Sequence, residues 1–373
     1  MVSEKVNPTA QKENNVYIFG AHSRAQTLKE YFSILHPDWQ VRAFLVDNDE
    51  PNPIRAGGTP VMHLPVDPNE LDTSAAVYLA IRGVHHPDVS ASLAECGFSE
   101  IIPVTPELDI ELRNAYLKIV MPQAGRTFIK IDDLPPGKKE KKSSGASRVY
   151  VIKSVYDKSL HTPYEMQPYE AYLQVGAART DGRIEENGLT DHTGENISDR
   201  NRQFCEITGL YWMWKHAPEV WIGLAHYRRH FLLPDDWQLR MEAADADVLL
   251  PTPLFVSPSL EENYKSRHTA DAFDAMMTYI RKQLPEEADD IQDFFRQNLY
   301  SPCNMFIMRR EVLDAYCAWV FPILFAVADM IGEKEDAYQN RYPAFLPERL
   351  LPCYFLIHRN EYQTIYADKN FLA

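Results

Sequence analysis

The sequence has few of the features that mark secreted, membrane-spanning or nucleic-acid-binding proteins. Basic residues are scarce, because 38 lysines and arginines stand against 53 acidic residues and give a net charge of −15. A chain this acidic lacks the broad cationic surface that binds nucleic acids or anionic membranes. Glycine is also scarce, with 15 residues against 26 prolines, which indicates rigid turns rather than flexible repeats. The apolar fraction of 45% and the charged fraction of 24% are those of an ordinary folded protein.

Cysteines and long hydrophobic runs are equally sparse. The five cysteines are widely spaced and form no Cys-x-x-Cys pair, which predicts neither a zinc ribbon nor a disulfide framework. The first 15 residues are polar and lack the apolar core of a secretory signal. The longest apolar run, 315–328, has 14 residues and contains Pro322, so it is too short for a membrane span and predicts a buried helix. We therefore expect a cytoplasmic protein.

The chain is long enough for two domains, at about 150 residues per domain. Five of the six tryptophans follow residue 200, so the two parts are built differently. Residues 135–145 (PPGKKEKKSSG) carry four lysines and no apolar side chain, which is typical of a solvated linker. We expect a first domain at 15–125, a linker at 126–147 and a second domain at 148–373. The basic run could also touch anionic lipid, which would place the protein at the inner face of the plasma membrane.

The first domain alternates short apolar strands with amphipathic helices. Such alternation predicts βαβ units and hence an α/β fold, a small doubly wound, Rossmann-like parallel sheet. We expect its elements as follows: strands at 16–19, 41–46, 77–81 and 100–104, and helices at 22–35 and 88–96.

The turn after the first strand is a candidate nucleotide site. Its sequence, Gly20-Ala21-His22-Ser23-Arg24-Ala25, shares the first glycine and the terminal small residue of the dinucleotide fingerprint G-x-G-x-x-G/A. Asp47 stands where a ribose-binding acid would lie. His22, however, replaces the glycine that lets the backbone approach the pyrophosphate. The turn resembles the Rossmann-like domains of sugar-modifying acyltransferases, and Gly20, His22 and Asp47 stay candidates beside the alternative of a scaffold or interface domain.

The second domain carries four blocks whose order and spacing are specific. It resembles, over about 220 residues, a family of bacterial capsule and exopolysaccharide biosynthesis domains with the GT-A glycosyltransferase fold. Some members of that family are galactofuranosyltransferases. The resemblance implies transfer of a sugar from a nucleotide-diphosphate donor during polysaccharide assembly. The four blocks are DHTGENISDRNRQFCEITGLYWMWKH (191–216), WIGLAHYRRHF (221–231), CNMFIMRR (303–310) and RYPAFLPERL (341–350).

A basic cluster stands where most GT-A enzymes hold a metal-binding Asp-x-Asp, at the end of a strand. Here the residues are His226, Tyr227, Arg228 and Arg229. Guanidinium groups donate paired hydrogen bonds to phosphate oxygens and can replace a metal ion there. We therefore expect His226, Arg228 and Arg229 to bind the donor diphosphate without a metal or other cofactor. A surface basic cluster is the alternative.

Two acidic pairs elsewhere in the chain match the Asp-x-Asp pattern. Asp245-x-Asp247 precedes an apolar strand at 248–251, and Asp47-x-Asp49 lies in the first domain. Such patterns arise by chance in a chain this acidic, and Asp247 is expected to begin a strand. If metal dependence is found, Asp245 and Asp247 are the positions to test.

Polar residues in the other blocks are candidates for contacts to the two substrates. Asp191, Asn196 and Asn201 lie before a helix expected at 202–216 and could read a uracil or ribose. The same polar block also offers Glu206. Ser198 or Asp199 as a helix cap is the structural alternative for this stretch. The segment CNMFIM (303–308) resembles the strand that lies under the acceptor pocket in GT-A folds, and its polar member Asn304 could bind an acceptor hydroxyl.

Glu348 and Arg349 are charged residues among apolar ones, so each must form an ion pair or have a role in binding or catalysis. An inverting transferase needs a carboxylate within reach of the acceptor hydroxyl as general base. We expect Glu348 to have this role, with Arg349 pairing it or touching phosphate. A purely structural pairing is the alternative.

Three function classes follow. The first is a glycosyltransferase that uses a UDP-sugar, UDP-galactofuranose among them, and extends a capsule, exopolysaccharide or O-antigen glycan, free or lipid-linked. The second is a nucleotide-sugar-modifying enzyme centred on the first domain. The third is a non-catalytic sugar-nucleotide-binding scaffold. Other polysaccharide-assembly proteins and peripheral membrane association are expected partners of the first class.

Overall fold

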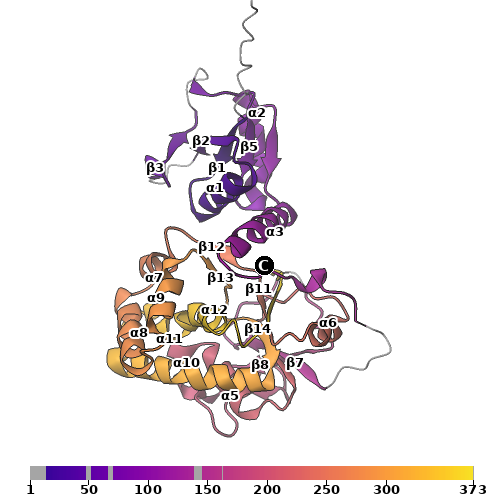
Figure 1. Cartoon of the computed structure of the whole chain (residues 1–373), viewed down its shortest axis with the longest axis vertical. Coiled ribbons are helices and arrows are strands. Elements are labelled where there is room, and N and C mark those ends of the chain that lie inside the picture. Colours follow the sequence, from indigo (N-terminus) through magenta and orange to yellow (C-terminus); the bar gives the residue numbers. More distant parts are fainter. Residues whose placement is uncertain (1–13, 48–51, 66–69, 138–144, 162, 373) are drawn as a thin grey trace, which may run out of the picture. The chain divides into compact units, whose positions relative to one another are not determined.

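The computed structural model describes residues 14–47, 52–65, 70–137, 145–161 and 163–372. These residues form two compact units, one ending at Arg126 and the other beginning at Thr127 (Figure 1). The predicted linker 126–147 was too wide, because Ile131 and Leu134 lie in the hydrophobic core of the second unit. Most of its lysine-rich part, 138–144, lies outside the described residues.

The first unit is an α/β domain with one mainly parallel sheet. The strand order is β3-β4-β2-β1-β5-β6, and β3 alone is antiparallel to its neighbour. The chain extends the sheet from β1 in one direction through β2 and β4, then in the other through β5 and β6. Its elements are β1 Asn14–Phe19, α1 Ser23–Leu35, β2 Trp39–Val46, β3 Arg55–Ala56, β4 Thr59–His63, β5 Ala76–Leu79, α2 His86–Glu95, β6 Ile101–Pro103 and α3 Pro106–Gln123.

Helices cover both faces of this sheet. Tyr17 and Phe19 of β1 pack with Val89 and Leu93 of α2. Strand side chains alternate between faces, so Ile18 faces the other side. There α1 packs against α3, where the rings of Tyr31 and Tyr116 lie 5.0 Å apart. The doubly wound arrangement predicted from the strand and helix alternation is thereby confirmed.

The second unit is built on a larger mixed sheet. The strand order is β15-β11-β14-β10-β7-β8-β9, and all strands run parallel except β14. A two-stranded pair, β12 with β13, stands apart from it. The strands are β7 Ser147–Lys153, β8 Glu170–Gln174, β9 Leu189–Thr190, β10 Trp221–His226, β11 Val248–Pro251, β12 Leu254–Phe255, β13 Leu299–Tyr300, β14 Phe306–Arg309 and β15 Thr364–Ala367.

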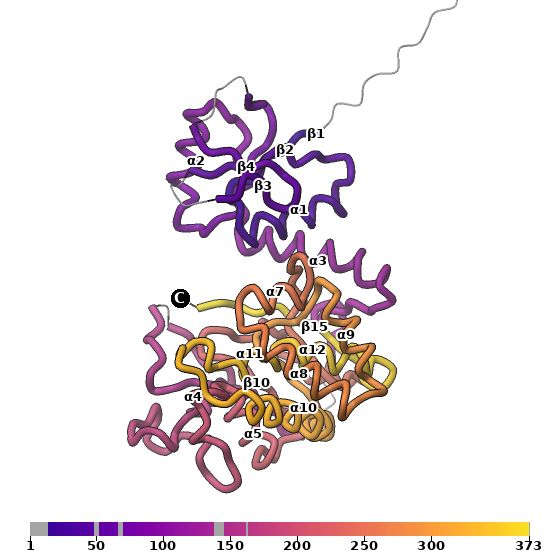
Figure 2. The backbone as a smooth tube through the Cα atoms, turned by 90° about the vertical axis from the view of Figure 1, so that its left-hand side faces the viewer, coloured from indigo at the N-terminus to yellow at the C-terminus, as the bar shows by residue number. Residues whose placement is uncertain are grey.

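Helices enclose the larger sheet. Trp237 and Met241 of α6 pack on one face with Trp221 of β10. On the other face α5 packs so closely that a Cβ on Gly209 would lie 2.6 Å from Ile152 of β7. Helix α10 runs beside α5 in both views (Figures 1 and 2). The helices are α4 Asn201–Phe204, α5 Ile207–His216, α6 Trp237–Ala243, α7 Leu260–Arg267, α8 Ala270–Gln283, α9 Ala288–Arg296, α10 Arg310–Ile331, α11 Tyr342–Phe345 and α12 Pro347–Ile357.

The apolar run at 315–328 is helical, as predicted, and lies within α10. Of the helices that the structure describes, α10 alone is long and apolar enough to cross a membrane, and 56% of its most apolar stretch is buried inside the fold. It packs against α8 and α12 as part of the core.

The strand expected to begin at Cys303 begins only at Phe306, so Asn304 precedes it, and two further element predictions were wrong in their boundaries. The helix expected at 202–216 is interrupted at Cys205, whose φ of 44° is left-handed, so α4 ends at Phe204 and α5 begins at Ile207. The strand expected at 221–231 ends at His226, because the backbone N–H of Arg229 turns back to the carbonyl of His226 at 2.8 Å. Both departures place polar residues at one edge of the sheet.

Candidate functional site

The site lies at the edge where the parallel strands of the second unit end. In α/β sheets this edge binds ligands, because loops from neighbouring strands converge there. The turn at 226–229 follows β10, and residues 368–370 follow β15. Since β14 is antiparallel, the residues before it, Cys303 and Asn304, arrive at the same edge. A hydrogen bond of 2.6 Å joins His226 Nε2 to the carbonyl of Cys303 across the gap.

His226 is neutral in this setting. Burial lowers the pKa of its imidazole, and the charges of Glu206 and Glu348 oppose this shift only in part. Because Nε2 faces a carbonyl, Nε2 carries the proton and donates it. The Arg229 guanidinium lowers the pKa further, so the ring acts as a fixed hydrogen-bond donor rather than as a cation. The prediction that His226 itself binds the diphosphate is not supported, because its Nε2–H is already used.

This assignment gives the first testable prediction, a pH dependence. The folded pKa of His226 is below its unfolded value of about 6.5, so the unfolded chain binds the extra proton. Its contribution to stability is therefore fully present above about pH 6.5 and is lost as the pH falls towards the folded pKa. We expect His226→Gln, which keeps a donor but cannot titrate, to lose less stability than wild type between pH 7.5 and 5.5 in urea unfolding. Equal losses in both proteins would contradict the assignment.

Glu348 is held at the same edge by two donors. Its Oε1 accepts the backbone N–H of Cys303 at 2.8 Å, and its Oε2 accepts Nη1 of Arg349 at 2.8 Å. The side chain is 24% exposed, so the carboxylate is fixed and still reachable. A carboxylate offers about four lone-pair sites, so acceptor capacity remains beyond these two bonds.

Arg349 was predicted to touch the donor diphosphate, but the structure buries its side chain. Its side chain is only 3% exposed. The guanidinium lies over the rings of Tyr264 and Tyr300, at 5.4 and 5.0 Å. Since it is enclosed and paired with Glu348, Arg349 orients that carboxylate and does not reach a bound phosphate. The structure has the pairing of Glu348 with Arg349 that the catalytic hypothesis and its structural alternative both expect.

Asn304 also serves a neighbouring carboxylate. Its Nδ2 donates to Glu206 Oε1 at 2.9 Å and to the carbonyl of Ala344 at 3.2 Å. The side chain is buried, so the acceptor contact predicted for Asn304 is not supported. Cys303 and Asn304 have φ values of 79° and 50°, in the left-handed region that non-glycine residues rarely adopt. Such strain is common where a backbone is held for function.

Three cations lie beside these acids. Arg228 and Arg229 follow β10, and Lys369 follows β15. The guanidinium carbon of Arg228 lies 5.1 Å from the centre of the Tyr227 ring, and that of Arg229 lies 5.3 Å from the centre of the Phe371 ring. Among the described residues, no carboxylate forms an ion pair with any of the three. Burial raises the pKa of the Cys303 thiol, and the charges of Lys369 and Arg229 both oppose this rise. Lys369 and Arg229 therefore both lie close to Cys303. These partly exposed cations can meet an anion.

Asp157 closes the cluster from the side of β7. Burial raises the pKa of its carboxyl group, and a hydrogen bond from the Ser154 N–H opposes this shift. The charges of Lys153 and Arg228 act in the same direction as that bond. Asp157 therefore faces the cationic turn after β10.

The residues predicted for the donor nucleotide have structural roles instead. Asp191 is fully buried and accepts the backbone N–H groups of Gly176 and Ala177 and the hydroxyl of Thr208. Asn201 donates to Thr208 and to the carbonyl of Cys205. These bonds tie β8 to α4 and α5, so neither side chain is free for a ligand.

Asn196 closes a local turn. Its Nδ2 donates to the carbonyl of Gly194, and its Oδ1 accepts the N–H of Ser198. This is the turn geometry that asparagine favours before a helix. Its predicted donor contact is not supported by this placement.

The fallback metal ligands lie at the opposite edge of the sheet. Asp245 and Asp247 precede β11, which begins at Val248, and Asp247 accepts the N–H of Gln363 at 2.8 Å. Asp245 is fully exposed. Within the described ranges, no three His, Cys, Asp or Glu side chains are grouped as metal ligands.

The nucleotide candidates of the first unit lie at its own sheet edge. Gly20 has a φ of 108°, and a Cβ there would lie 3.3 Å from Ile81, so the turn requires glycine. His22 precedes α1 and is exposed, and Asp47 follows β2. Nη1 of Arg24 donates to the carbonyl of Ile81 at 2.7 Å, so this side chain crosses from α1 to the end of β5. No phosphate-binding role follows from these contacts.

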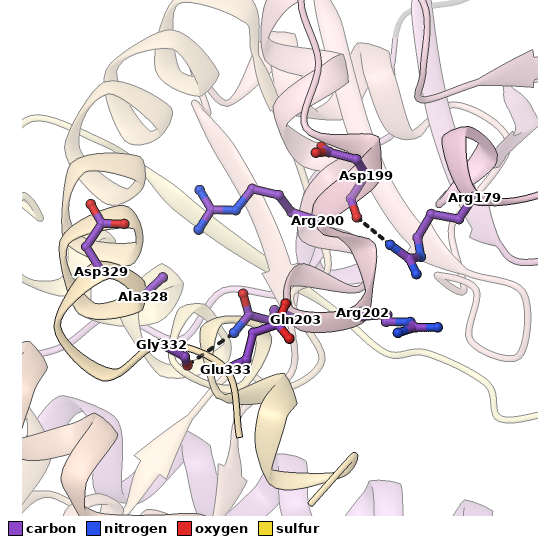
Figure 3. A pocket seen from close by; sticks show the side chains of 9 residues that line it. All are labelled: Arg179, Asp199, Arg200, Arg202, Gln203, Ala328, Asp329, Gly332 and Glu333. Atoms are coloured by element: carbon purple, nitrogen blue, oxygen red, sulfur yellow. Dashed lines mark hydrogen bonds between the residues drawn. The ribbon is translucent and has the colours of Figure 1, made fainter. Parts of the chain in front are cut away.

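Two cavities lie outside the cluster. The first has a volume of about 500 Å³ and opens between the arginines of the 176–202 segment and the end of α10 (Figure 3). Its three arginines, Arg179, Arg200 and Arg202, are balanced by three acids, Asp199, Asp329 and Glu333. The second has a volume of about 480 Å³ and lies beside residues 231–234 and 368–370. None of the predicted donor residues lines either one.

A match to a family profile covers residues 156–360, more than half of the chain. The family is described as "Domain of unknown function (DUF4422)". The chain belongs to this family. The match contains the turn after β10, the Cys303–Asn304 segment and Glu348, so most of the cluster lies inside it. Lys369 lies outside.

A solved structure, described as the apo form of the bifunctional glycosyltransferase WbbM, has a similar fold, with 23% identity and a TM-score of 0.52. The match covers 61% of this chain and 45% of that chain, so the protein spans less than half the length of the structure it resembles. At this identity the likeness shows a shared α/β fold. No curated protein matches.

Sequence reasoning missed three members of the cluster, Asp157, Cys303 and Lys369, and it offered Glu206 only as one polar residue of its block. Glu206 and Cys303 stand within blocks already singled out, but nothing in a linear pattern shows that Asn304 reaches back to Glu206. Asp157 follows the first strand of the domain, a position where parallel sheets present ligand-binding residues. Only Lys369 had no signal, since the strand order that brings β15 to this edge is invisible in the sequence.

Proposed function

We propose that the second unit is a glycosyltransferase that moves a sugar from a nucleotide-diphosphate donor to a glycan. The observation that carries this proposal is the cluster at the strand ends, where three cations that pair with no carboxylate in the described part of the chain lie beside fixed carboxylates. The cations suit a diphosphate and the carboxylates suit an attacking hydroxyl. UDP-sugars, UDP-galactofuranose among them, are the proposed donors. The proposed acceptor is a capsule, exopolysaccharide or O-antigen glycan, free or lipid-linked.

The reaction breaks the bond between the anomeric carbon and the diphosphate oxygen. An acceptor hydroxyl forms the new bond to that carbon and gives its proton to a carboxylate. The nucleoside diphosphate leaves with one more negative charge. Arg228, Arg229 and Lys369 stabilise this charge as it develops, and preorganised charges of this kind contribute the largest part of many rate enhancements. Arg side chains bind phosphate oxygens in pairs, so no metal ion is required for this step.

Glu348 is the proposed general base. Arg349 and the Cys303 N–H fix its two oxygens, while its exposed fraction leaves it open to an acceptor. Glu206 and Asp157 are nearby carboxylates, but Glu206 is held by Asn304 and Asp157 by the backbone of Ser154.

We propose that the enzyme works in the cytoplasm, at the inner face of the plasma membrane, together with other polysaccharide-assembly proteins.

The test is an activity assay of the full chain with a panel of UDP-sugars and neutral glycan acceptors, with and without EDTA. We expect release of UDP that depends on the donor sugar and is unchanged by EDTA, because the phosphate-binding charges belong to the protein. UDP release abolished by EDTA and restored by Mn²⁺ would overturn the metal-independent mechanism. Tight UDP binding without turnover of any donor would favour the non-catalytic scaffold.

A further inference from the structure

The cavity of about 480 Å³ beside the cluster has the chemistry of a saccharide site. Its size is within the range of small-molecule sites, about 300 to 1,000 Å³. Aromatic and apolar side chains form part of the wall, and acids and amides form the rest. The apolar members are Tyr164, Tyr169, Phe231, Leu232, Leu233 and Pro234; the polar ones are Asp132, Gln167, Asp368 and Asn370.

A buried polar pair holds the Tyr164 ring in place. The imidazole of His230 is fully buried, lies 3.7 Å from the Tyr164 ring and is stacked on it. His230 Nδ1 bonds Glu170 Oε1 at 2.8 Å, and the hydroxyl of Tyr164 donates to the other oxygen of Glu170 at 3.0 Å. Tyr164 is half-buried, so one face of its ring is supported from below. A ring fixed in this way can stack on the apolar face of a sugar without losing side-chain freedom.

The charges of the wall separate this cavity from the phosphate-binding cluster. No lysine or arginine is among the residues that line it. Lys130, which is not among the lining residues, pairs with the carboxylate of Asp368 and, at 3.4 Å, with that of Asp132. The Asp132 side chain is still 58% exposed. A phosphate group would meet a carboxylate here and no cation. Hydroxyl groups, in contrast, can donate to a carboxylate and bond the amides of Gln167 and Asn370.

A short antiparallel ladder connects the cavity to the cluster. The N–H of Leu372 donates to the carbonyl of Arg228, that of Asn370 to His230, and that of Leu232 to Asp368. The ladder begins at the arginines and ends at the cavity wall. With a rise of about 3.3 Å per residue, Leu232 lies roughly 10 Å along the chain from Arg229, a length of about two sugar units.

We propose that this cavity binds the acceptor glycan, as a neutral saccharide whose ring stacks on Tyr164 while its hydroxyls meet Asp132, Gln167 and Asn370. The assignment as acceptor rests on the proposed function. The polar groups come from three separate segments of the chain, at 132, 167 and 368–370, which suits a ring with several hydroxyls better than a flat base. Leu232, which is 47% exposed, forms the apolar rim.

The test measures binding and kinetics of the full chain with neutral methyl glycosides and their disaccharides in the gluco, galacto and manno series. Saturation-transfer NMR without donor is expected to show binding of at least one of these saccharides. Leu232→Glu and Tyr164→Ala are each expected to raise the acceptor KM about tenfold, the size of effect of one lost pocket contact, with the donor KM unchanged. Tyr164→Phe, which keeps the ring, is expected to raise it less than Tyr164→Ala. Met330→Glu, at an exposed apolar residue of α10, is the matched control and is expected to behave as wild type.

The outcomes separate this inference from the proposed function. An acceptor KM unchanged in Leu232→Glu, in an enzyme that transfers sugar, would overturn the acceptor site alone. A rise in the Kd for UDP instead would assign the cavity to the donor nucleoside and also overturn it. If no donor is turned over, the proposed function fails, and saccharide binding that Leu232→Glu weakens would still support the cavity as a sugar site.

Discussion

Replacing Arg228 and Arg229 together with glutamine is expected to lower kcat by about 10³-fold. Loss of a single preorganised group that stabilises developing charge costs about 10²- to 10³-fold. The two guanidiniums form no ion pair with a described carboxylate, so their removal breaks none. The Ser154 N–H and Lys153 still stabilise the Asp157 carboxylate when the charge of Arg228 is removed. The folded state should therefore tolerate the change. Steady-state UDP release at saturating donor measures the effect.

Lysine substitutions sharpen this test. Arg228→Lys with Arg229→Lys keeps both positive charges but removes the paired hydrogen bonds of the guanidinium, so an intermediate loss of kcat is expected. Arg202→Gln is the matched control, because Arg202 is an exposed arginine that lines the cavity of Figure 3, and no residue of the cluster lines that cavity. A glutamine double variant with wild-type kcat, in a protein of unchanged urea midpoint, would remove the two arginines from the mechanism.

Glu348→Gln is expected to lower kcat by about 10²- to 10⁴-fold, the contribution of a positioned general base. The glutamine oxygen can still accept the Cys303 N–H, so the local backbone is retained. The charge on the buried Arg349 then lacks its partner, which costs about 3 kcal/mol of stability. The assay is therefore run at a temperature where urea unfolding shows the variant folded, with UDP binding as a check on the site.

Glu206→Gln separates a catalytic role of Glu348 from a structural one. Glu206 accepts a hydrogen bond from Asn304 in the same cluster, so both variants lose one negative charge near His226. We expect kcat to fall far more in Glu348→Gln than in Glu206→Gln. A larger loss in Glu206→Gln would transfer the base role to Glu206. Equal small losses would leave Glu348 as a residue that only holds Arg349 and Cys303.

The α/β fold of both units could be predicted because periodicity is a local property. Short apolar runs such as 16–19 and 248–251 became strands β1 and β11, and the apolar run at 315–328 became part of α10. The errors arose where the chain changes direction within an apolar or helical pattern. The left-handed residue Cys205 and the turn at 226–229 end their elements early, and both depend on contacts with distant segments.

The sequence by itself showed that cations are scarce, that the chain has two parts, and that the basic turn His226–Arg229 follows an apolar strand. It also identified Glu348 as a charge that needed a partner. Only the tertiary structure decided which polar residues share a site. Asp191 and Asn201 hold loops together, while Asn304 and Arg349 orient carboxylates instead of meeting substrate. The physical reason is that burial and hydrogen-bond partners come from strands far apart in the chain, and the order β15-β11-β14-β10-β7 sets which strand ends meet.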